Sequence, residues 1–239
     1  MMAVLPMISL VRRDGSLCYD LNGRNSSCGP GFDQCLPLPW NDTAAPQFHV
    51  RDRTCAIGDP NEPVFDPKHG LYHIFYQKEA VYKPWPRGSL TQGPVQGHAV
   101  SSDLVHWAHL PVALWNDEPY DSVAVYTGSA AVVNGSVRLV YPGVCDGPYY
   151  KHSPLNATWP ACGTDFQHHY SLVVASPSDD EADPLLTKWS KRVVANDTER
   201  DPSAAWQTES GEWRFVTWDG WQFATMDFIT FYRRGQVSG

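Results

Sequence analysis

The chain has 239 residues, with 18 Lys and Arg against 26 Asp and Glu, and its net charge is −8. An acidic chain of this kind is poorly suited to coating nucleic acid or an anionic membrane, so we expect neither as a partner. Aromatic residues make up 13% of the chain, which argues against disorder, and 18 Gly with 20 Pro predict many turns and short strands.

Residues 1–54 are irregular, because Cys, Asn, Gly and Pro recur there without any periodic pattern. We predict an N-terminal arm held by disulfides, since none of the cysteine spacings is the close pair-and-pair pattern of a structural zinc site. The cysteines are Cys18, Cys28, Cys35, Cys55, Cys145 and Cys162. We expect Cys145 to pair with Cys162 and the other four to fix the arm, although six cysteines allow about 15 pairings. Buried free thiols in a cytosolic protein are the alternative.

Several features indicate the secretory pathway. Five glycosylation sequons begin at Asn25, Asn41, Asn134, Asn156 and Asn196. The apolar stretch at residues 1–11 is a weak match to a signal peptide, because its positive charges, Arg12 and Arg13, follow the apolar residues. No run of about 18 apolar residues is present, so we expect no membrane span. We therefore predict a secreted or vacuolar protein without an evident signal peptide.

From about residue 55 onward, short apolar runs alternate with turn signals and predict an all-β protein. The predicted strands are Val64–Phe65, Leu71–Gln77, Ala124–Val133, Ser136–Tyr141, Tyr170–Ala175 and Trp213–Trp218. Asn134-Gly135, between two of these strands, is a strong signal for a two-residue hairpin turn. Only Asp179–Lys191 has room for a helix, and Pro184 limits it to about one turn.

A faint repeat runs through the same region. In three places a strand leads through a polar turn to two apolar residues and an aromatic residue. The three segments are Gly97–Trp107, Tyr170–Trp189 and Trp221–Phe231. A unit of strands repeated in this way is typical of β-propeller blades, since one blade does not bury its faces alone. Ordinary hairpins in a β-sandwich are the alternative.

Two Asp-Pro pairs contain the candidate catalytic carboxylates. Asp59 lies in Gly58–Asn61 before a predicted strand, and Pro60 restricts its backbone to an extended conformation that directs the carboxylate. Asp201 lies beside Arg200, which can bind a ligand hydroxyl or hold the carboxylate ionised. The alternatives are an Asx-turn cap for Asp59 and a surface salt bridge for Asp201.

Gln77 ends the predicted strand Leu71–Gln77, where its amide can both donate to and accept from a sugar hydroxyl. Two carboxyl groups with aromatic walls and amide side chains are the groups that glycoside hydrolases use. In those enzymes one carboxylate attacks the anomeric carbon, and a protonated acid serves the leaving oxygen.

Taken together, these segments resemble glycoside hydrolase family 32, the invertases, inulinases and related fructosidases. Each motif is short, but the motifs follow the family's order from about residue 55 to residue 231. The matching segments are Gly58–Asn61, Gly70–Gln77, Gly97–Trp107, Tyr120–Asp121, Tyr126–Ala130 and Arg200–Trp206.

The resemblance implies a five-bladed β-propeller with a central funnel-shaped pocket, usually followed by a β-sandwich. It also implies retaining hydrolysis of terminal β-fructosyl bonds in sucrose or other fructose-containing oligo- and polysaccharides, through a fructosyl-enzyme and without a metal or organic cofactor. Asp59 corresponds to the nucleophile and Asp201 to the transition-state stabiliser that binds fructose hydroxyls. The positions that line the sugar pocket correspond to Asn61, Gln77, Trp85, Tyr126, Thr127 and Arg200.

The chain also departs from the family pattern. Gly58 and Glu62 replace an Asn and a Gly in the nucleophile motif, and Gln96 stands where Trp is common. The family's general acid, a Glu followed by Cys, has no counterpart, since the downstream Glu209 and Glu212 lie in a polar hairpin turn and neither precedes a Cys.

We therefore expect residues 55–239 to form two blades and part of a third, and the chain to be a fragment of a longer protein. Fructosyl hydrolysis is the favoured function. One alternative is a carbohydrate-binding protein that lacks the general acid, because losing proton delivery costs about 10²–10⁴-fold in rate. Another is a five-bladed glycosidase that acts on arabinose-containing polysaccharide, which the Gly58–Asn61 and Arg200–Pro202 motifs disfavour.

Overall fold

The computed structural model describes residue 50 and residues 57–79, 94–146, 168–178 and 181–237. These residues form fourteen β-strands and no α-helix, which confirms the all-β prediction. Accordingly, the described part of the chain contains no helix that is long and apolar enough to cross a membrane. The predicted N-terminal arm at residues 1–54 lies outside the described residues, apart from Val50.

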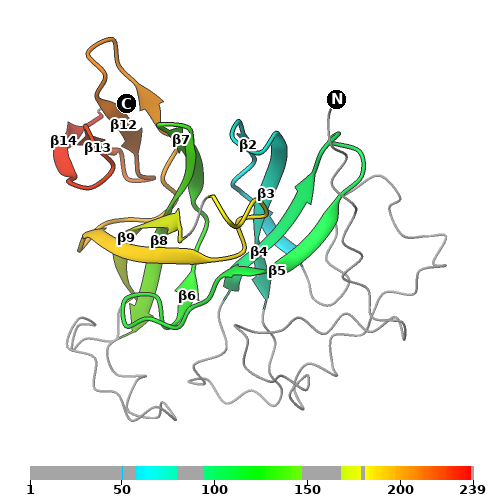
Figure 1. The fold of residues 1–239 in the computed structure, drawn as a ribbon. Coiled ribbons are helices and arrows are strands. Elements are labelled where there is room, and N and C mark those ends of the chain that lie inside the picture. The colour runs from blue at the N-terminus through cyan, green and yellow to red at the C-terminus, as the bar shows by residue number, and fades with distance from the viewer. Residues whose placement is uncertain (1–49, 51–56, 80–93, 147–167, 179–180, 238–239) are drawn as a thin grey trace.

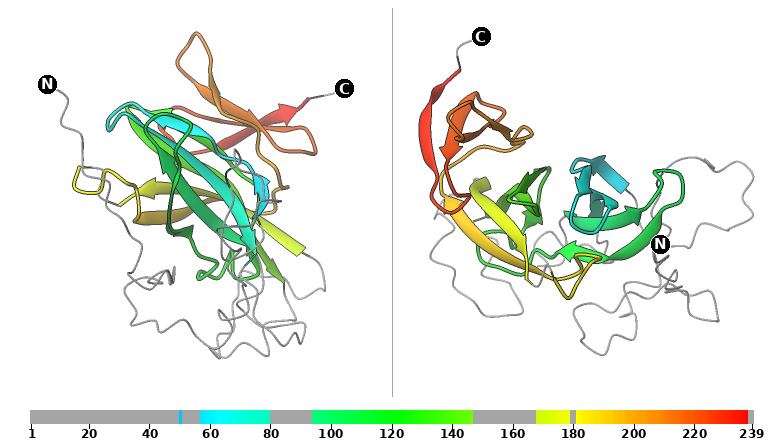
Figure 2. Two further views of the ribbon diagram at one scale, coloured as in Figure 1. Left: turned by 90° about the vertical axis from the view of Figure 1, so that its right-hand side faces the viewer. Right: turned by 45° about the horizontal axis from the view of Figure 1, so that its top comes forward.

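The strands form three antiparallel sheets that follow one another along the chain. The first sheet contains β1 (Ile57–Pro60), β2 (Val64–Asp66), β3 (Leu71–Glu79), β4 (Pro94–Ser101) and β5 (Ala108–Leu114). The second contains β6 (Ala124–Val125), β7 (Ser129–Val133), β8 (Ser136–Asp146), β9 (His168–Pro177) and β10 (Trp189–Ala195). The third contains β11 (Trp206–Gln207), β12 (Trp213–Val216), β13 (Trp221–Thr225) and β14 (Tyr232–Gln236). The three sheets lie in chain order along an arc, as in a partial propeller (Figures 1 and 2).

The second sheet is buried on both of its faces. Leu139 and Val173 point toward the first sheet and share a hydrophobic cluster with Phe75. The next residues along these strands, Val140 and Val174, point to the opposite face of the sheet and belong to a second hydrophobic cluster. That cluster also contains Phe215, Phe223 and Phe228 from the region of the third sheet. Because successive side chains of a strand alternate between its faces, an uninterrupted apolar run such as that in β9 fills both cores.

The repeat predicted from the sequence is present as a corner that recurs once for each sheet. Its central residue has a positive φ although it is not glycine: Leu104 (64°), Leu186 (51°) and Phe228 (56°). In each corner an Asp carboxylate accepts two backbone N–H groups, and the acceptors are Asp103, Asp183 and Asp227. In two of them the Trp three residues after the central residue donates its indole N–H to that residue's carbonyl oxygen. These side-chain hydrogen bonds offset the strain of the left-handed backbone.

Two local predictions differ in outcome. Asn134 and Gly135 have φ of 51° and 78°, and Val133 pairs with Ser136, as a tight two-residue hairpin turn requires. By contrast, the described part of Asp179–Lys191 contains turns and the start of β10 rather than a helix. Its backbone is instead held by the Asp183 carboxylate, which accepts from Thr187.

Two further expectations about the sheets need correction. The predicted strand Ala124–Val133 is interrupted, because Tyr126–Gly128 separates β6 from β7. The third sheet is also larger than the expected part of a blade, since four short strands pair in it.

Cys145 is disulfide-bonded, whereas Cys162 lies outside the described residues, so their pairing stays a prediction.

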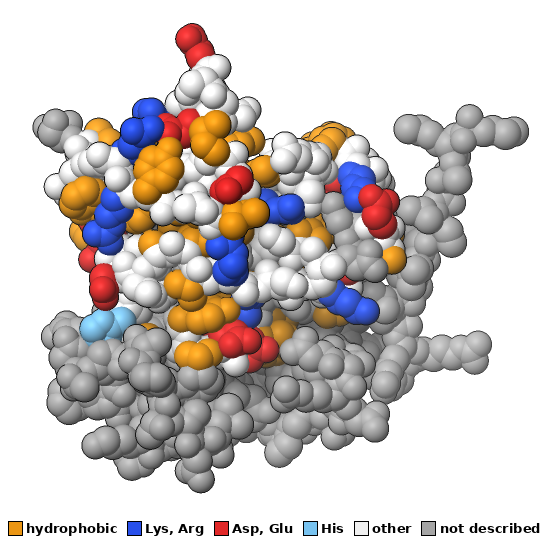
Figure 3. Space-filling view, turned by 60° about the vertical axis from the view of Figure 1, so that its left-hand side comes forward, with side chains coloured by type: hydrophobic (Ala, Val, Ile, Leu, Met, Phe, Trp, Pro, Cys, Tyr) orange, Lys and Arg blue, Asp and Glu red, His pale blue; other side chains and the backbone are white. Residues whose placement is uncertain are grey.

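Figure 3 shows the side of the molecule that carries the third sheet. Hydrophobic side chains on this face alternate with Lys, Arg and polar groups (Figure 3). The exposed apolar residues of the third sheet region include Trp218, Met226 and Ile229, each about 60% exposed. They lie among charged neighbours, and singly exposed apolar residues of this kind are normal on protein surfaces.

Candidate active site

Asp59 is presented by β1, the strand at one edge of the first sheet. This strand pairs with β3, with Pro60 opposite Tyr76. Gly58 lies close against Gln77, since a Cβ at position 58 would be 3.0 Å from the Gln77 Cβ. The Asp59 side chain is exposed, and its hydrogen bond comes from another sheet rather than from its own loop, unlike an Asx-turn cap.

Thr127 connects the second sheet to this carboxylate. Its hydroxyl donates to Asp59 Oδ2 over 2.8 Å. The Gln77 amide donates to the Thr127 hydroxyl oxygen over 2.6 Å. The Thr127 hydroxyl therefore accepts a hydrogen bond from Gln77 and donates one to Asp59, and both partners belong to the first sheet. Because its oxygen already accepts from Gln77, its proton is oriented toward Asp59. Three of the predicted site residues thus meet in one hydrogen-bonded chain.

Asn61 makes a second link between the same two segments. With its amide oriented to satisfy both neighbours, it donates to the carbonyl oxygen of Phe75 (2.9 Å) and accepts from the backbone N–H of Gly128 (3.3 Å). Its own backbone N–H also donates to Phe75 (3.1 Å). In this arrangement Asn61 holds the Tyr126–Gly128 segment in place, and its contact with a sugar stays a prediction.

Asp201 lies in the loop between β10 and β11, with a φ of 55° that is unusual for a non-glycine residue. Burial raises the pKa of Asp201 above its ordinary value, while Arg200 lowers it and the charge of Asp59 raises it further. The charge of Asp59 therefore acts on Asp201. The Arg200 Nε lies 3.6 Å from Asp201 Oδ2, and both side chains are exposed.

Arg200 is itself held by an aromatic neighbour. Its guanidinium carbon lies 5.6 Å from the ring centre of Trp218, and the Trp218 indole N–H donates to Glu199 over 3.0 Å. A cation held over an aromatic face keeps its remaining N–H donors available to a ligand. The contact between Arg200 and Asp201 is the salt bridge that the sequence analysis gave as the alternative interpretation of Asp201.

The second sheet positions the Asp201 loop as well as Thr127. Ser129, two residues after Thr127, donates its hydroxyl to the carbonyl oxygen of Ser203 over 2.8 Å. Ser203 follows Asp201 by two residues, so this bond ties the two sides of the site together. The segment from Tyr126 to Ser129 is therefore the common support of both candidate carboxylates.

Tyr126 is half-buried and lies 6.3 Å from Tyr170, measured between ring centres. Its carbonyl oxygen accepts from the buried Gln96 amide over 3.4 Å. The Gln96 Oε1 has no hydrogen-bond partner. Gln96 thus supports the backbone behind Tyr126. Trp85, the remaining predicted pocket residue, lies outside the described residues.

The two downstream glutamates differ from the expected general acid. Glu212 is buried and accepts from Tyr232, Arg234 and Arg214. The hydrogen bonds from Tyr232 and the two arginines lower the pKa of Glu212 to about 2, the opposite of the change a general acid requires. Glu209 is exposed at the hairpin turn between β11 and β12.

Asp121, in the segment Tyr120–Asp121 that resembles the family, is fully buried. Lys191 donates to it over 2.8 Å and Tyr141 over 2.9 Å. Lys191 also donates to Asp117 and to the carbonyl oxygen of Trp115. Burial raises the pKa of Asp121 to about 6, against the lowering effect of Lys191.

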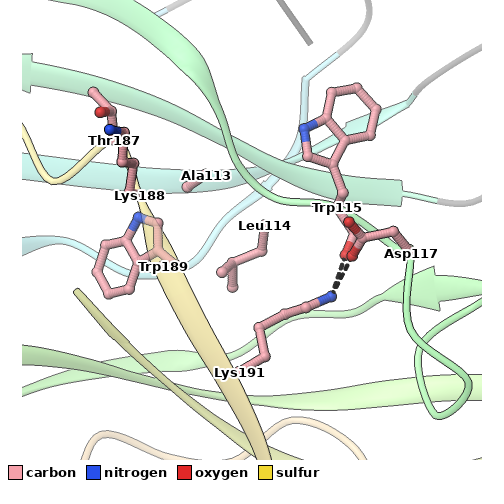
Figure 4. Close-up of a pocket in the computed structure, with 8 residues that line it drawn as sticks. All are labelled: Ala113, Leu114, Trp115, Asp117, Thr187, Lys188, Trp189 and Lys191. Carbon is pink, nitrogen blue, oxygen red and sulfur yellow. Dashed lines mark hydrogen bonds and ion pairs between the residues drawn. The ribbon is translucent and has the colours of Figure 1, made fainter. Parts of the chain in front are cut away.

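A pocket of about 200 Å³ lies beside this network, between β5 and β10 (Figure 4). Its lining residues are Ala113, Leu114, Trp115, Asp117, Thr187, Lys188, Trp189 and Lys191. In Figure 4 the Lys191 side chain points away from the Trp189 ring toward Asp117. None of these residues belongs to the Asp59 site, so the pocket is a separate feature of the junction between the first two sheets.

Sequence reasoning missed the supports of the site: Gly128, Ser129 and the break between β6 and β7. A signal for the break was present, because a Gly within a predicted strand often marks close approach of another chain segment. A Cβ on Gly128 would lie 2.1 Å from Glu62 Oε1 and 2.4 Å from the Val140 carbonyl oxygen.

Comparison with known proteins gives one consistent result. The family model "Glycosyl hydrolases family 32 N-terminal domain" matches residues 49–237. Among curated relatives, acid beta-fructofuranosidase 4, vacuolar, of Arabidopsis thaliana is 34% identical over 227 residues, which cover 90% of this chain and 29% of the relative. The acid beta-fructofuranosidase of Phaseolus vulgaris is 33% identical over 216 residues, covering 85% of this chain and 28% of the relative.

Solved structures agree with this fold. Fructan 1-exohydrolase IIa from Cichorium intybus superposes with a TM-score of 0.59 at 26% identity, covering 79% of this chain and 33% of that protein. A family 32 beta-fructofuranosidase of Bombyx mori reaches 0.57 at 20% identity, covering 81% of this chain and 38% of that protein, and supports the fold alone. The chain therefore spans less than a third of the length of the two curated relatives.

Proposed function

Because the chain belongs to glycosyl hydrolase family 32, we propose that it carries the nucleophile and the fructose-binding side of an enzyme that hydrolyses terminal β-fructosyl bonds. The observation that carries the proposal is the hydrogen bond from Thr127 to Asp59 Oδ2. It leaves the other oxygen of an exposed, oriented carboxylate available to attack a sugar. Asp201, close enough for the Asp59 charge to raise its pKa, supplies the second carboxylate of the pair.

The proposed reaction retains configuration. Asp59 attacks the anomeric carbon of the fructosyl group, the bond to the leaving oxygen breaks, and water then hydrolyses the fructosyl-enzyme. Asp201 and Arg200 bind fructose hydroxyls and stabilise the charge that develops on the ring. The chemistry uses no metal or organic cofactor. The leaving oxygen takes its proton from an acid other than Glu212, whose lowered pKa makes it a poor donor.

Sucrose and fructans are the proposed substrates. Curated relatives are named beta-fructofuranosidases. Structures of similar proteins were solved with 1-kestose, for the Cichorium intybus enzyme, and with sucrose, for the Bombyx mori enzyme. Asp59 and Asp201 are both exposed, as carboxylates that contact a terminal fructosyl group must be.

We also propose a vacuolar or secreted location. Relatives from Arabidopsis thaliana and a Rosa hybrid cultivar carry the word vacuolar in their names. The five sequons and the disulfide at Cys145 are consistent with passage through the secretory pathway.

A carbohydrate-binding protein without turnover is the second candidate. It is favoured by one observation: the glutamates that follow Asp201 within the described residues, Glu209 and Glu212, lie in a hairpin and a salt-bridge cluster. Binding then depends on the same residues, but hydrolysis is slower by about 10²–10⁴-fold because no acid serves the leaving group.

The test measures fructose release from sucrose and inulin by the disulfide-formed chain and by Asp59→Asn. Release by the wild type that is abolished in Asp59→Asn supports the enzyme. Fructose binding without release by a folded chain supports the binding protein. Equal release by both forms would contradict the assignment of Asp59 as the nucleophile.

A further inference from the structure

Glu62 is a buried carboxyl group directly behind the candidate active site. Its side chain has no exposed surface, and neither of its oxygens has a hydrogen-bond partner. It lies three residues after Asp59 and replaces a residue that is usually Gly in the family. A buried ionised carboxylate without a partner is very costly, so the folded protein needs this group in its neutral form.

The Glu62 side chain reaches from the first sheet to the second. Its Oε1 lies 2.1 Å from the point that a Cβ on Gly128 would occupy, and the Val140 carbonyl oxygen lies 2.4 Å from the same point. The missing side chain of Gly128 therefore makes the space that Glu62 fills. A neutral carboxylic acid has one O–H to donate, and the Val140 carbonyl is an acceptor on the same side.

Glu62 is one of three neighbouring side chains that contact the break between β6 and β7. Asp59 accepts from Thr127, Asn61 accepts from the Gly128 N–H, and Glu62 occupies the space against the Gly128 backbone. We propose that Glu62 is a positioning residue that holds the Thr127–Gly128 segment against Asp59 only while its side chain is uncharged, so that its ionisation at higher pH switches the fructose site off. This proposal deepens the proposed function and rests on it for the identity of the ligand.

The charges around Glu62 do not compensate its ionisation. Burial raises the pKa of Glu62 well above its ordinary value, and no charged neighbour contributes to that shift. Among the residues whose side chains the structure describes, the titratable and charged groups on the adjoining strands are Asp59 on β1, Asp66 on β2, Tyr72, His73, Tyr76 and Lys78 on β3, and Arg138 and Tyr141 on β8. None of them forms a hydrogen bond with Glu62. Once ionised, Glu62 must gain water or a donor, which requires the two sheets to separate at Gly128.

A raised pKa is also a property of a general acid, but Glu62 does not have the position of one. A proton donor must reach the leaving oxygen, directly or through one water. Glu62 has no exposed surface and faces the second sheet, whereas the open side of the site is that of Asp59 and Asp201. Its influence on the reaction therefore passes through Thr127 and Gly128.

The experiment compares the wild-type chain with Glu62→Gln and Glu62→Met, which fill the space but do not titrate. Glu209→Gln, in the exposed hairpin turn, is the matched control. Fructose affinity and the thermal midpoint are measured from about pH 5 to about pH 9, the range in which buried glutamates ionise. Above the pKa of Glu62, wild-type and Glu209→Gln affinity should fall up to about tenfold for each pH unit, as release of one proton requires.

The Gln and Met variants should bind at pH 5 about as well as the wild type and should lack this alkaline fall. Equal pH slopes in wild type and Glu62→Gln would overturn the proposal. The proposal would also be overturned if Glu62→Gln and Glu62→Met both failed to fold while Glu209→Gln folded, because the site should tolerate neutral side chains of similar length. A folded wild type that binds no fructose at any pH contradicts the proposed function instead, and the thermal midpoints then still decide whether Glu62 titrates as inferred.

Discussion

Thr127 donates its hydroxyl proton to Asp59 Oδ2 over 2.8 Å, and this bond joins two sheets and two residues that are 68 positions apart in the chain. The direction of the bond is set by Gln77, which donates to the same hydroxyl oxygen. A hydroxyl that accepts from an amide and donates to a carboxylate has a defined orientation. The geometry of the candidate nucleophile therefore depends on how the first and second sheets pack.

The first prediction concerns this hydroxyl. Thr127→Val keeps the shape of the side chain but removes the hydrogen bond to Asp59, and a hydrogen bond to a charged group contributes about 1.5–3 kcal/mol. Turnover or fructose affinity should fall roughly 10–100-fold, as such an energy implies. Steady-state kinetics or calorimetry measures the loss. Thr230→Val, at an exposed corner residue, should change neither quantity, and an unchanged Thr127→Val would show that the bond has no role.

The second prediction concerns the space next to Glu62. A Cβ on Gly128 would meet Glu62 Oε1 at 2.1 Å, the Val140 carbonyl oxygen at 2.4 Å and the Tyr141 Cβ at 2.9 Å. Gly128→Ala should therefore lower the free energy of unfolding by about 1–3 kcal/mol, the usual range for overpacking. Gly235→Ala is the control, because no atom lies within 4 Å of its Cβ position. Denaturant unfolding of both variants checks the difference, and equal stabilities would argue against close packing at Gly128.

The third prediction concerns acid. His73 and His98 share a buried hydrogen bond of 2.9 Å. Burial is the main cause that lowers the pKa of His73 from 6.5 to about 4, against the raising effect of Asp66. Below pH 6.5 the unfolded chain binds a proton that the folded chain excludes, so this contribution to stability is present above that pH and is lost as pH falls toward 4.

For this pair, the wild type should lose about 3 kcal/mol more than His73→Asn between about pH 7 and about pH 4, the free energy that such a pKa difference represents. The comparison with a variant is needed because Glu62 and Asp121 have raised pKa values and act in the opposite direction. His106→Asn, at an exposed histidine, serves as the control. Urea unfolding at several pH values gives the measurement, and parallel pH profiles for wild type and His73→Asn would exclude this account.

The fourth prediction separates structure from proton transfer at Glu212. Glu212→Gln removes the charge that Arg214 and Arg234 contact, so the thermal midpoint should fall. Turnover per folded molecule should not show the roughly 10²–10⁴-fold loss expected of a general acid. Glu209→Gln, in the same hairpin but exposed, should alter neither property. A turnover loss of that size in Glu212→Gln would indicate that Glu212 is the general acid after all.

Local patterns explain which parts of the fold were predictable. Alternation and turn residues located most of the strands in the second sheet, and Asn134-Gly135 adopts the positive φ pair that its hairpin requires. The strand predicted at Ala124–Val133 was wrong in its middle, because Tyr126–Gly128 is shaped by contacts from Asn61 and Glu62. These contacts come from a distant part of the chain, so no local pattern near residue 127 predicts them.

Local patterns in the amino-acid sequence were enough to predict the all-β class and the recurring corners, because periodicity and turn chemistry act over a few neighbouring residues. They also identified the two Asp-Pro pairs as candidate catalytic carboxylates. What those groups contact depends on how the three sheets pack. In the folded protein, Asp59 accepts a hydrogen bond from Thr127 of the second sheet, Glu62 is buried behind the site, and Asp121 accepts a hydrogen bond from Lys191. Burial and long-range hydrogen bonds set these outcomes, and both depend on which strands pack together rather than on the residues next in sequence.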